Sequence, residues 1–145
     1  MENASLLDTV DEDVFDHEVQ PELLRVFLAN PANLLVVAVS EGQVVGMASG
    51  ITYVHPDKPL ALFINEVGVS ARFHRRGLGK QLVSRLIEKG QEAGCTEAWV
   101  ATEVDNKPAR ALYEALGGVQ DEELAVVYVY PLKGEAGPGH GDGDA

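Results

Sequence analysis

The chain of 145 residues has the length of one domain, and hydrophobic residues make up 46% of it, enough for an ordinary core. No apolar run approaches the ~18 residues of a membrane span, and we expect a soluble protein. The formal net charge of −12 argues against nucleic acid as a partner, because nucleic-acid-binding proteins usually carry a basic patch. The single cysteine, Cys95, allows no internal disulfide and suits the reducing cytoplasm; we interpret it as a packed residue rather than a nucleophile.

The N-terminal third predicts one helix and one hairpin. Residues 1–20 are acidic and lack periodicity, with residues 5–10 as a candidate short strand. Pro21 suits the first turn of a helix that Asn30 and Pro31 close. Residues 34–40 and 44–54 read as two strands joined by a tight turn, and the loop at 55–59 leads to a central strand.

The central strand, at residues 60–69, is followed by a basic glycine loop at 74–80 and a helix that ends near Gly94. A helix that begins at glycines exposes free backbone N–H groups and the positive end of its dipole, which together form an anion site. Of the eleven Lys and Arg residues, six lie between positions 72 and 89. The sequence therefore predicts one local site for a polyanion, within an acidic surface that either attracts cations or serves solubility alone.

The C-terminal part predicts a strand at residues 96–102, with Trp99 in the core, and then a helix through Leu116 that Asn106 or a neighbour caps. Residues 124–130 read as a final strand. This order predicts an α/β (α+β) domain over residues 1–133, in which helices flank both faces of a mixed sheet. Residues 134–145 are of low complexity and read as a disordered tail, so we expect no metal site from His140, Asp142 and Asp144.

Two common phosphate motifs fail on spacing. A Walker A loop needs glycine where His74 stands and Ser or Thr after Lys80. The dinucleotide-binding fingerprint needs a third glycine at Leu82, so neither a P-loop NTPase nor a Rossmann enzyme is favoured. The loop instead resembles the acyl-CoA pyrophosphate loop of the GNAT acetyltransferase superfamily, whose pattern is Gln or Arg, two residues, Gly, one residue, then Gly or Ala. Here His74 replaces the usual Gln or Arg, while Gly77 and Gly79 match.

A second motif strengthens this resemblance. Residues 105–117 contain Asn106, Ala109, Leu112 and Tyr113 in a glycine-ended helix, as GNAT enzymes commonly do about thirty residues beyond the loop. The resemblance covers residues 34–130. It implies the GNAT fold, with a mixed, mostly antiparallel sheet, and acetyl-CoA as the cofactor. By resemblance, the cofactor-binding residues are Val67, Gly68, Val69, His74, Arg75, Arg76, Gly77, Leu78, Gly79, Lys80, Asn106, Ala109, Arg110 and Tyr113.

The chemistry requires a base, because the acceptor amine must attack as the neutral species. Glu66 is the candidate, since an acid in an apolar strand is costly to bury without a role; alternatively it faces solvent on the other side of the pleat. Tyr113 is expected to hydrogen-bond the leaving thiolate, unless it only packs on its helix. Glu103 and Asp105, just past the strand at 96–102, could meet the acceptor's ammonium groups or have no role.

Within the superfamily, residues 53–69 and the later acids look most like the aminoglycoside 3-N-acetyltransferases, which acetylate a polycationic sugar. The expected partner is therefore a small polycationic amine, and the resemblance adds the expectation of a homodimer. Two alternatives stay open. The acceptor could be a polyamine or a protein amine, or the chain could be a CoA-binding module without turnover.

Overall fold

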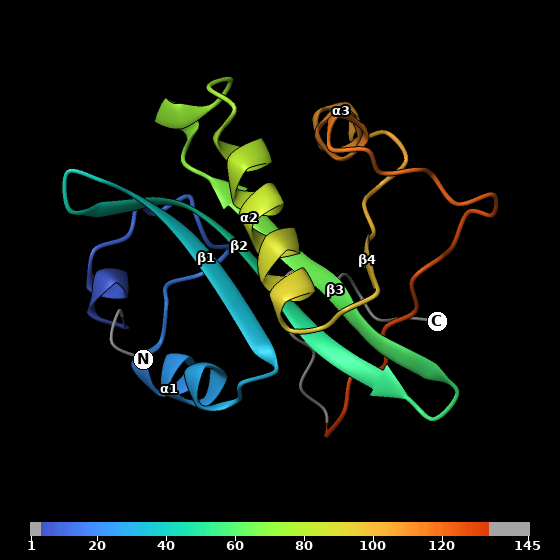
Figure 1. Cartoon of the computed structure of the whole chain (residues 1–145). Coiled ribbons are helices and arrows are strands. Elements are labelled where there is room, and N and C mark those ends of the chain that lie inside the picture. The colour runs from blue at the N-terminus through green and yellow to red at the C-terminus, as the bar shows by residue number, and fades with distance from the viewer. Residues whose placement is uncertain (1–3, 134–145) are drawn as a thin grey trace.

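A mixed four-stranded sheet forms the centre of the computed structural model, which describes residues 4–133 (Figure 1). Its strands lie in chain order, with β1, β2 and β3 antiparallel and β4 parallel to β3. This is the predicted mixed, mostly antiparallel sheet. The strands are β1 (Asn33–Ser40), β2 (Gln43–His55), β3 (Lys58–Val69) and β4 (Glu97–Val100).

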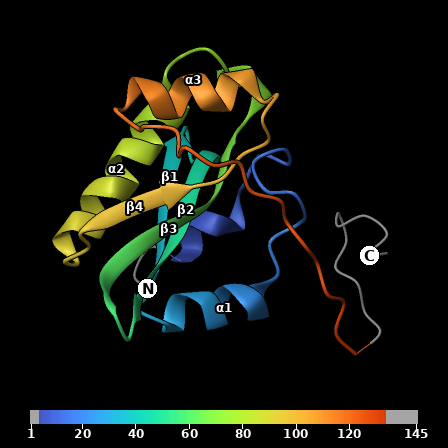
Figure 2. The ribbon, with the colours of Figure 1, turned by 90° about the vertical axis from the view of Figure 1, so that its right-hand side faces the viewer.

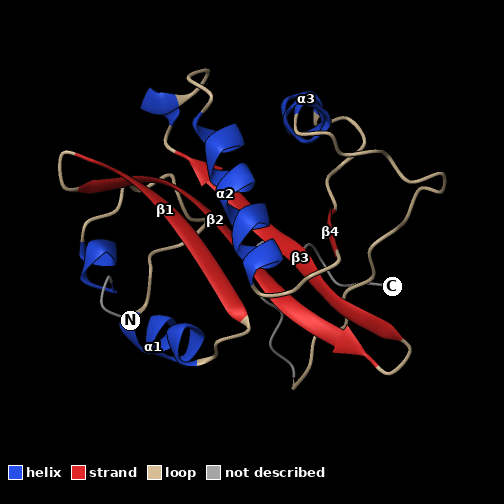
Figure 3. Cartoon of the chain, in the orientation of Figure 1, coloured by secondary structure: helices blue, strands red, loops and turns tan. Residues whose placement is uncertain are grey.

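Helices cover both faces of the sheet, as the sequence predicts. Figure 3 shows α2 (Leu78–Glu92) lying along one face, and Figure 2 shows α1 (Pro21–Ala29) and the N-terminal segment on the other side. The helix α3 (Lys107–Ala115) follows β4 and lies near the start of α2. No helix in the described ranges is both long and apolar enough to cross a bilayer.

Side chains alternate between two cores across the sheet. Leu62 and Ile64 of β3 pack with Leu82, Val83 and Leu86 of α2 on one face. On the other face, Met47 of β2 packs with Leu7, Val14 and Val44, and Leu24 of α1 joins this cluster. The sheet therefore separates an α2 face from an N-terminal face, and a strand residue reaches one or the other according to its place in the pleat.

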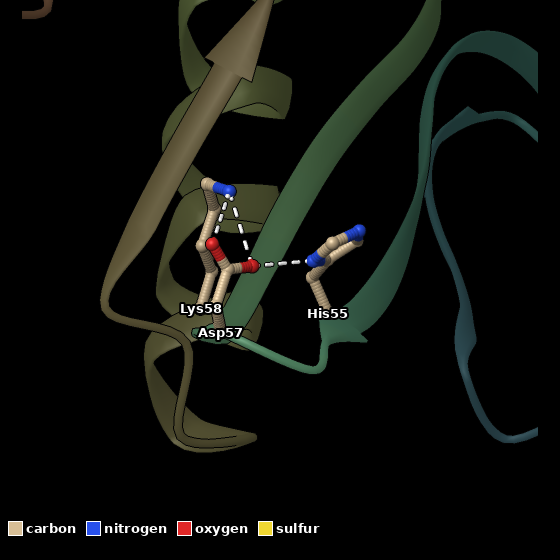
Figure 4. A network of polar contacts seen from close by, with 3 residues as sticks. All are labelled: His55, Asp57 and Lys58. Carbon is tan, nitrogen blue, oxygen red and sulfur yellow. Dashed lines mark hydrogen bonds and ion pairs between the residues drawn. The ribbon is translucent and has the colours of Figure 1, made fainter.

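Two tight turns set the register of the antiparallel strands. Glu41 and Gly42 both have positive φ, at 49° and 78°, as a two-residue hairpin turn requires, and Ser40 pairs with Gln43. The second turn is shorter than the predicted loop at 55–59, because His55 already pairs with Lys58. At its tip the Asp57 carboxylate accepts from the His55 ring and from the Lys58 ammonium at 3.1 Å (Figure 4), which lowers the pKa of Asp57.

The candidate strand at residues 5–10 is wrong. Residues Ala4–Asp8 form a 3-10 helix, η1, and only Val10 makes an isolated parallel bridge, to Val44. The helical turn seats Leu7 in the core under the sheet, which an extended chain along a sheet edge would not do.

The predicted strand at residues 124–130 is also wrong. This stretch forms no strand and exposes Leu124, Val126, Val127, Tyr128 and Tyr130. Its β-branched and aromatic residues favour extended backbone, but a strand also needs hydrogen-bonding partners on a neighbouring strand, and β4 runs for only four residues. The tail at 134–145, with His140, Asp142 and Asp144, lies outside the described residues.

Candidate active site

The strands β3 and β4 separate part-way along their length. Their ladder ends at Ile64 and Val100, whereas β3 continues to Val69 with β2 as its partner on the other edge. Within residues 4–133, β3 beyond Ile64 therefore has no strand partner on the edge that faces β4, and its outward backbone groups are open there. We call this opening between residues 65–69 and the end of β4 the fork.

A β-bulge at Asn65 determines where Glu66 points. Gly50 pairs with Ile64 and Ser49 with Glu66, so Asn65 is the extra residue in β3. Ile64 and, after the bulge, Val67 pack toward α2. Glu66 therefore lies on the N-terminal face, beside the fork.

Glu66 is exposed, contrary to the expectation that this acid lies buried in an apolar strand. The expected cost of burying this acid does not arise, because the bulge turns its side chain outward. Its position at the fork remains the reason to consider it as a base, while the open alternative, a solvent-facing acid on the far side of the pleat, matches its exposure.

The basic glycine loop begins α2 as predicted. Gly77 is the N-cap residue with φ 74°, a left-handed conformation that suits glycine, and Arg75 shares it at φ 65°. The first helical bond runs from the Gln81 N–H to the Gly77 carbonyl at 3.1 Å. Within residues 4–133 no acceptor bonds the N–H groups of Leu78, Gly79 or Lys80, so they are available to an anion.

Some side chains of the loop contact neighbouring residues, and others are exposed to solvent. The His74 ring donates from Nε2 to the Val69 carbonyl at 2.9 Å, which ties the loop back to the end of β3. Arg76 lies over the Phe73 ring, and Arg75 and Lys80 are exposed. A shallow hollow of about 320 Å³ beside α2 is lined in part by Lys80, Arg85 and Glu88, and the ion pair between Arg85 and Glu88 leaves Lys80 as its unpaired charge among the described residues.

The N-terminal segment bonds residues 71 and 72, which join the end of β3 to the glycine loop. Asp11 accepts from Arg72 Nε at 2.8 Å, and Asp13 accepts from the Ala71 N–H at 2.8 Å. The hydrogen bond from Arg72 lowers the pKa of Asp11, and the bond from the Ala71 N–H lowers that of Asp13. We call Asp11, Asp13 and Val14 the N-terminal clamp.

Val14 seats against β3 at Gly68. A Cβ at Gly68 would lie 2.0 Å from the Val14 carbonyl oxygen, so only glycine permits this approach. Sequence reasoning missed the whole clamp, because its partners lie about sixty residues apart and no local pattern links them.

The second motif lies against the first. A Cβ at Gly79 would lie 2.9 Å from Leu112 Cδ1, so α3 packs directly on the first turn of α2. Asn106 caps α3 as predicted, accepting from the Ala109 N–H at 3.2 Å. The two motifs that the resemblance joins are thus neighbours in space.

The remaining predicted residues border the fork from the β4 side. Arg110 donates to the Val104 carbonyl and to Gln120, both at 2.7 Å, and so braces the loop after β4. Burial raises the pKa of Tyr113 above its ordinary value of 10.0, which keeps its hydroxyl protonated at neutral pH. Glu103 and Asp105 are exposed on that loop.

Trp99 is not in the core, contrary to the prediction, because it is 46% exposed on the N-terminal face.

Across residues 4–133 no three His, Cys, Asp or Glu side chains gather at one point as a metal site would require.

The model of the acetyltransferase (GNAT) family matches residues 4–118, which include the glycine loop, the fork and α3. The chain belongs to this family. Its fold is the GNAT fold, and the family uses acetyl-CoA.

Curated relatives in the family act on different amines. The chain is 32% identical over 107 residues to the L-2,4-diaminobutyric acid acetyltransferase of Virgibacillus pantothenticus, covering 74% of this chain and 66% of the relative. It is 31% identical over 105 residues to human N-alpha-acetyltransferase 30, covering 72% of this chain and 29% of the relative. The chain thus spans less than two thirds of either relative's length.

Solved structures share the family fold. An aminoglycoside acetyltransferase from an uncultured soil metagenomic sample superposes with a TM-score of 0.70 at 25% identity, over 88% of this chain and 89% of the other. The aminoglycoside N-acetyltransferase AAC(6')-Iy in complex with CoA gives a TM-score of 0.66 at 24% identity, over 75% and 84%.

Proposed function

We propose that this protein is an acetyl-CoA-dependent N-acetyltransferase that acetylates a primary amine of a small polycation. The observation that carries the proposal is the fork. There, the part of β3 that has no strand partner on this edge within residues 4–133 lies next to the free N–H groups of α2, with the Val69 carbonyl already bonded by His74, and Glu66 lies at the opposite face of the sheet. A donor held from the α2 face and an acceptor approaching from the N-terminal face would meet between residues 65–69 and β4.

The proposed donor site follows from the charges and the free backbone groups. The pyrophosphate of acetyl-CoA fits the N–H groups of Leu78, Gly79 and Lys80, with Arg75 and Lys80 as nearby cations. His74 would contribute indirectly, because its ring bonds Val69. The backbone of Val67, Gly68 and Val69 would meet the pantetheine arm, with Asn106, Ala109 and Arg110 on the other side.

The proposed chemistry is direct transfer. Glu66 removes a proton from the acceptor ammonium, and the neutral amine attacks the thioester carbon. As the carbon–nitrogen bond forms, a backbone N–H at the fork stabilises the negative charge that develops on the carbonyl oxygen. The carbon–sulfur bond then breaks, and the second proton of the attacking nitrogen passes to the departing sulfur, so that the products are the amide and the free thiol. The Tyr113 hydroxyl, kept protonated by burial, hydrogen-bonds the departing thiolate.

For the acceptor we propose an aminoglycoside, modified at the 3-amino group. The net charge of −12 and the exposed acids Glu66, Glu103 and Asp105 favour a polycation. Aminoglycoside acetyltransferases are among the structures with the same fold, and two of them, AAC(6')-Iy and AAC(6')-IG, are enzymes of the 6′-N type. The 3-N position therefore rests on the resemblance of residues 53–69 alone. The diamino acid substrate of the relative from Virgibacillus makes a short diamine the second candidate.

The test measures release of thiol from acetyl-CoA with sisomicin, neamine, spermidine, 2,4-diaminobutyrate and N-terminal peptides. We expect turnover with the aminoglycosides and a fall in kcat of about a hundredfold in Glu66→Gln, in the range of lost general-base catalysis. Mass spectrometry of the product would locate the acetyl group. Glu92→Gln, which makes the same charge change at an exposed position of α2, is the control and should retain full activity.

Each other result selects a different reading. Turnover only on diaminobutyrate, spermidine or peptides would retain the acetyltransferase and reject the aminoglycoside. Equal rates for Glu66→Gln and the parent protein would remove Glu66 as the base. Tight CoA binding without turnover on any amine would favour a non-catalytic module.

A further inference from the structure

Three aromatic side chains lie together on the N-terminal face of the sheet, next to the fork. Phe63 pairs with Trp99 across β3 and β4, and Tyr53 pairs with Ala61 one row away. Side chains two residues apart on a strand share a face, so Tyr53, Phe63 and Trp99 are on the same side of the sheet. We call these three residues the aromatic strip.

The strip is held rigid and is open to solvent. The Trp99 indole donates from Nε1 to the Tyr53 hydroxyl at 2.6 Å, and the Phe63 and Trp99 rings lie 4.6 Å apart. Trp99 is 46% exposed and Tyr53 is 40% exposed. The N-terminal segment covers Met47 and Gly68 on this face but leaves the strip open.

This exposure is unusual for a strand face with so much apolar area. Large aromatic side chains usually lie in a core, and their exposure in a fixed cluster marks a surface that binds something. Because the hydrogen bond between Trp99 and Tyr53 already fixes both rings, a ligand would lose little affinity to ordering them.

Acidic side chains lie at both ends of the strip. Glu97 is in the same row as Tyr53, since both pair with Ala61, and Glu66 follows Phe63 after the bulge. Both glutamates are exposed, and neither has a salt-bridge partner in the part of the chain that the structure describes. At about 3.3 Å per residue, the five residues from the Ala61 row to Glu66 separate them by roughly 15 Å.

We propose that the aromatic strip with Glu97 is the docking surface for the acceptor, and that this acceptor is an elongated polycation with at least two ammonium groups and saturated rings that present weakly polar C–H faces. The inference rests on the proposed function, because it assigns to Glu66 the amine that reacts. A ring of the acceptor lies on Trp99 and Tyr53, where its ammonium groups gain cation–π attraction. A distal ammonium group meets Glu97, and the reacting amine reaches Glu66.

The surface would select acceptors by length. A short diamine that occupies Glu66 cannot also reach the strip and Glu97, whereas an aminoglycoside or similar aminosugar can contact all three. The Tyr53 oxygen accepts from Trp99, so its own O–H stays free to donate to a hydroxyl group of the acceptor.

The experiment compares a long acceptor with a short one in the full-length protein. Steady-state kinetics with sisomicin and with 2,4-diaminobutyrate would be measured for Trp99→Leu, Tyr53→Phe and Glu97→Gln, with Glu92→Gln as the charge-matched control on the α2 face. We expect Trp99→Leu and Glu97→Gln each to raise the KM for sisomicin about tenfold, in the range of one cation–π contact or one ion pair. The KM for acetyl-CoA and all constants for diaminobutyrate should stay within twofold of the parent protein.

Calorimetric titration of sisomicin into the CoA-bound protein measures the affinity for the acceptor without turnover, so it tests docking independently of catalysis. Weaker binding of sisomicin to Trp99→Leu and Glu97→Gln supports the strip as the docking surface even if no amine turns over.

Unchanged sisomicin kinetics in all three variants, with an active parent, would overturn the strip as the docking surface and retain the acetyltransferase. A parent that neither binds nor acetylates sisomicin also overturns it, as does a parent that dimerises through Trp99, because the strip would then bind a second copy. Tyr53→Phe removes the hydroxyl to which Trp99 donates but keeps the ring, so it should raise the KM for sisomicin by a smaller factor than Trp99→Leu. A variant that keeps the parent's constants for acetyl-CoA and diaminobutyrate is folded, so a loss confined to sisomicin cannot be ascribed to misfolding.

Discussion

The two walls of the fork are built differently. The wall formed by β3 and α2 contributes Leu62, Ile64, Leu82, Val83 and Leu86 to a buried core, and the N-terminal clamp bonds it from behind. The wall formed by β4 and α3 contains no fully buried residue, and α3 with its C-cap adds only partly buried side chains to the α2 core, namely Leu112, Tyr113 and Leu116.

The two walls would have different functions, one in binding the phosphates and the other in meeting the acceptor. The wall that would bind the phosphates is part of the hydrophobic core. A substitution that changes its geometry should therefore also lower the free energy of unfolding. The wall that would carry Tyr113 and face the acceptor rests on contacts that can change without unfolding the domain. Substitutions in the first wall should therefore affect stability, and those in the second mainly activity.

The largest expected effect is that of Gly68→Ala. The new Cβ would meet the Val14 carbonyl oxygen at 2.0 Å, and backbone cannot move aside cheaply, so we expect a loss of about 3 kcal/mol in the free energy of unfolding. Gly79→Ala is the matched substitution where the two walls touch. Its new Cβ would meet only the end of the Leu112 side chain, which can move, so the free energy of unfolding should fall by less than about 1 kcal/mol. Urea denaturation measures both. Equal losses would show that the walls do not differ as described.

The next effect concerns Tyr113. Tyr113→Phe keeps the packed ring and removes only the hydroxyl, so we expect kcat to fall about tenfold or less, below the loss in Glu66→Gln, with unchanged stability. Tyr128→Phe, at an exposed position, should have no effect on thiol release. A Tyr113→Phe enzyme slower than Glu66→Gln would reverse the importance given to the two residues.

The smallest effect is on acid stability, through the clamp. The pKa values of Asp11 and Asp13 lie below their ordinary value of 3.8 in the folded protein. Each group therefore stabilises the fold above that value, and the contribution is lost as the pH falls from it through the lowered pKa. Asp11→Asn and Asp13→Asn should lower Tm modestly at pH 6 and converge with the parent protein only once the pH has fallen below the lowered pKa values of the folded state. A constant difference in Tm down to acid pH would mean that the bonds do not depend on charge.

The sequence predicted the parts of the site that local chemistry determines. The glycine loop, the start of α2 at Gly77 and the cap at Asn106 depend on residues adjacent in the chain, and all three are confirmed. The order of the elements, together with the hairpin, also predicted the mixed sheet and the helices on both faces.

The features that the sequence could not predict depend on strand register and on contacts between residues far apart in the chain. The bulge at Asn65, which turns Glu66 to the N-terminal face, is visible only in the pairing with β2. The bond between Asp11 and Arg72 joins segments that no periodicity connects. For residues 124–130, propensity pointed to a strand, but no neighbouring strand pairs with them.

Trp99 is the only tryptophan in the chain. Its indole is half-exposed, lies tilted against the Phe63 ring and donates a hydrogen bond to the Tyr53 hydroxyl at the edge of the fork. Its ultraviolet emission therefore comes from one position next to the proposed meeting point of donor and acceptor. A ligand that covered the ring would shift this emission to shorter wavelength, so the protein carries its own optical probe of occupancy, without any label.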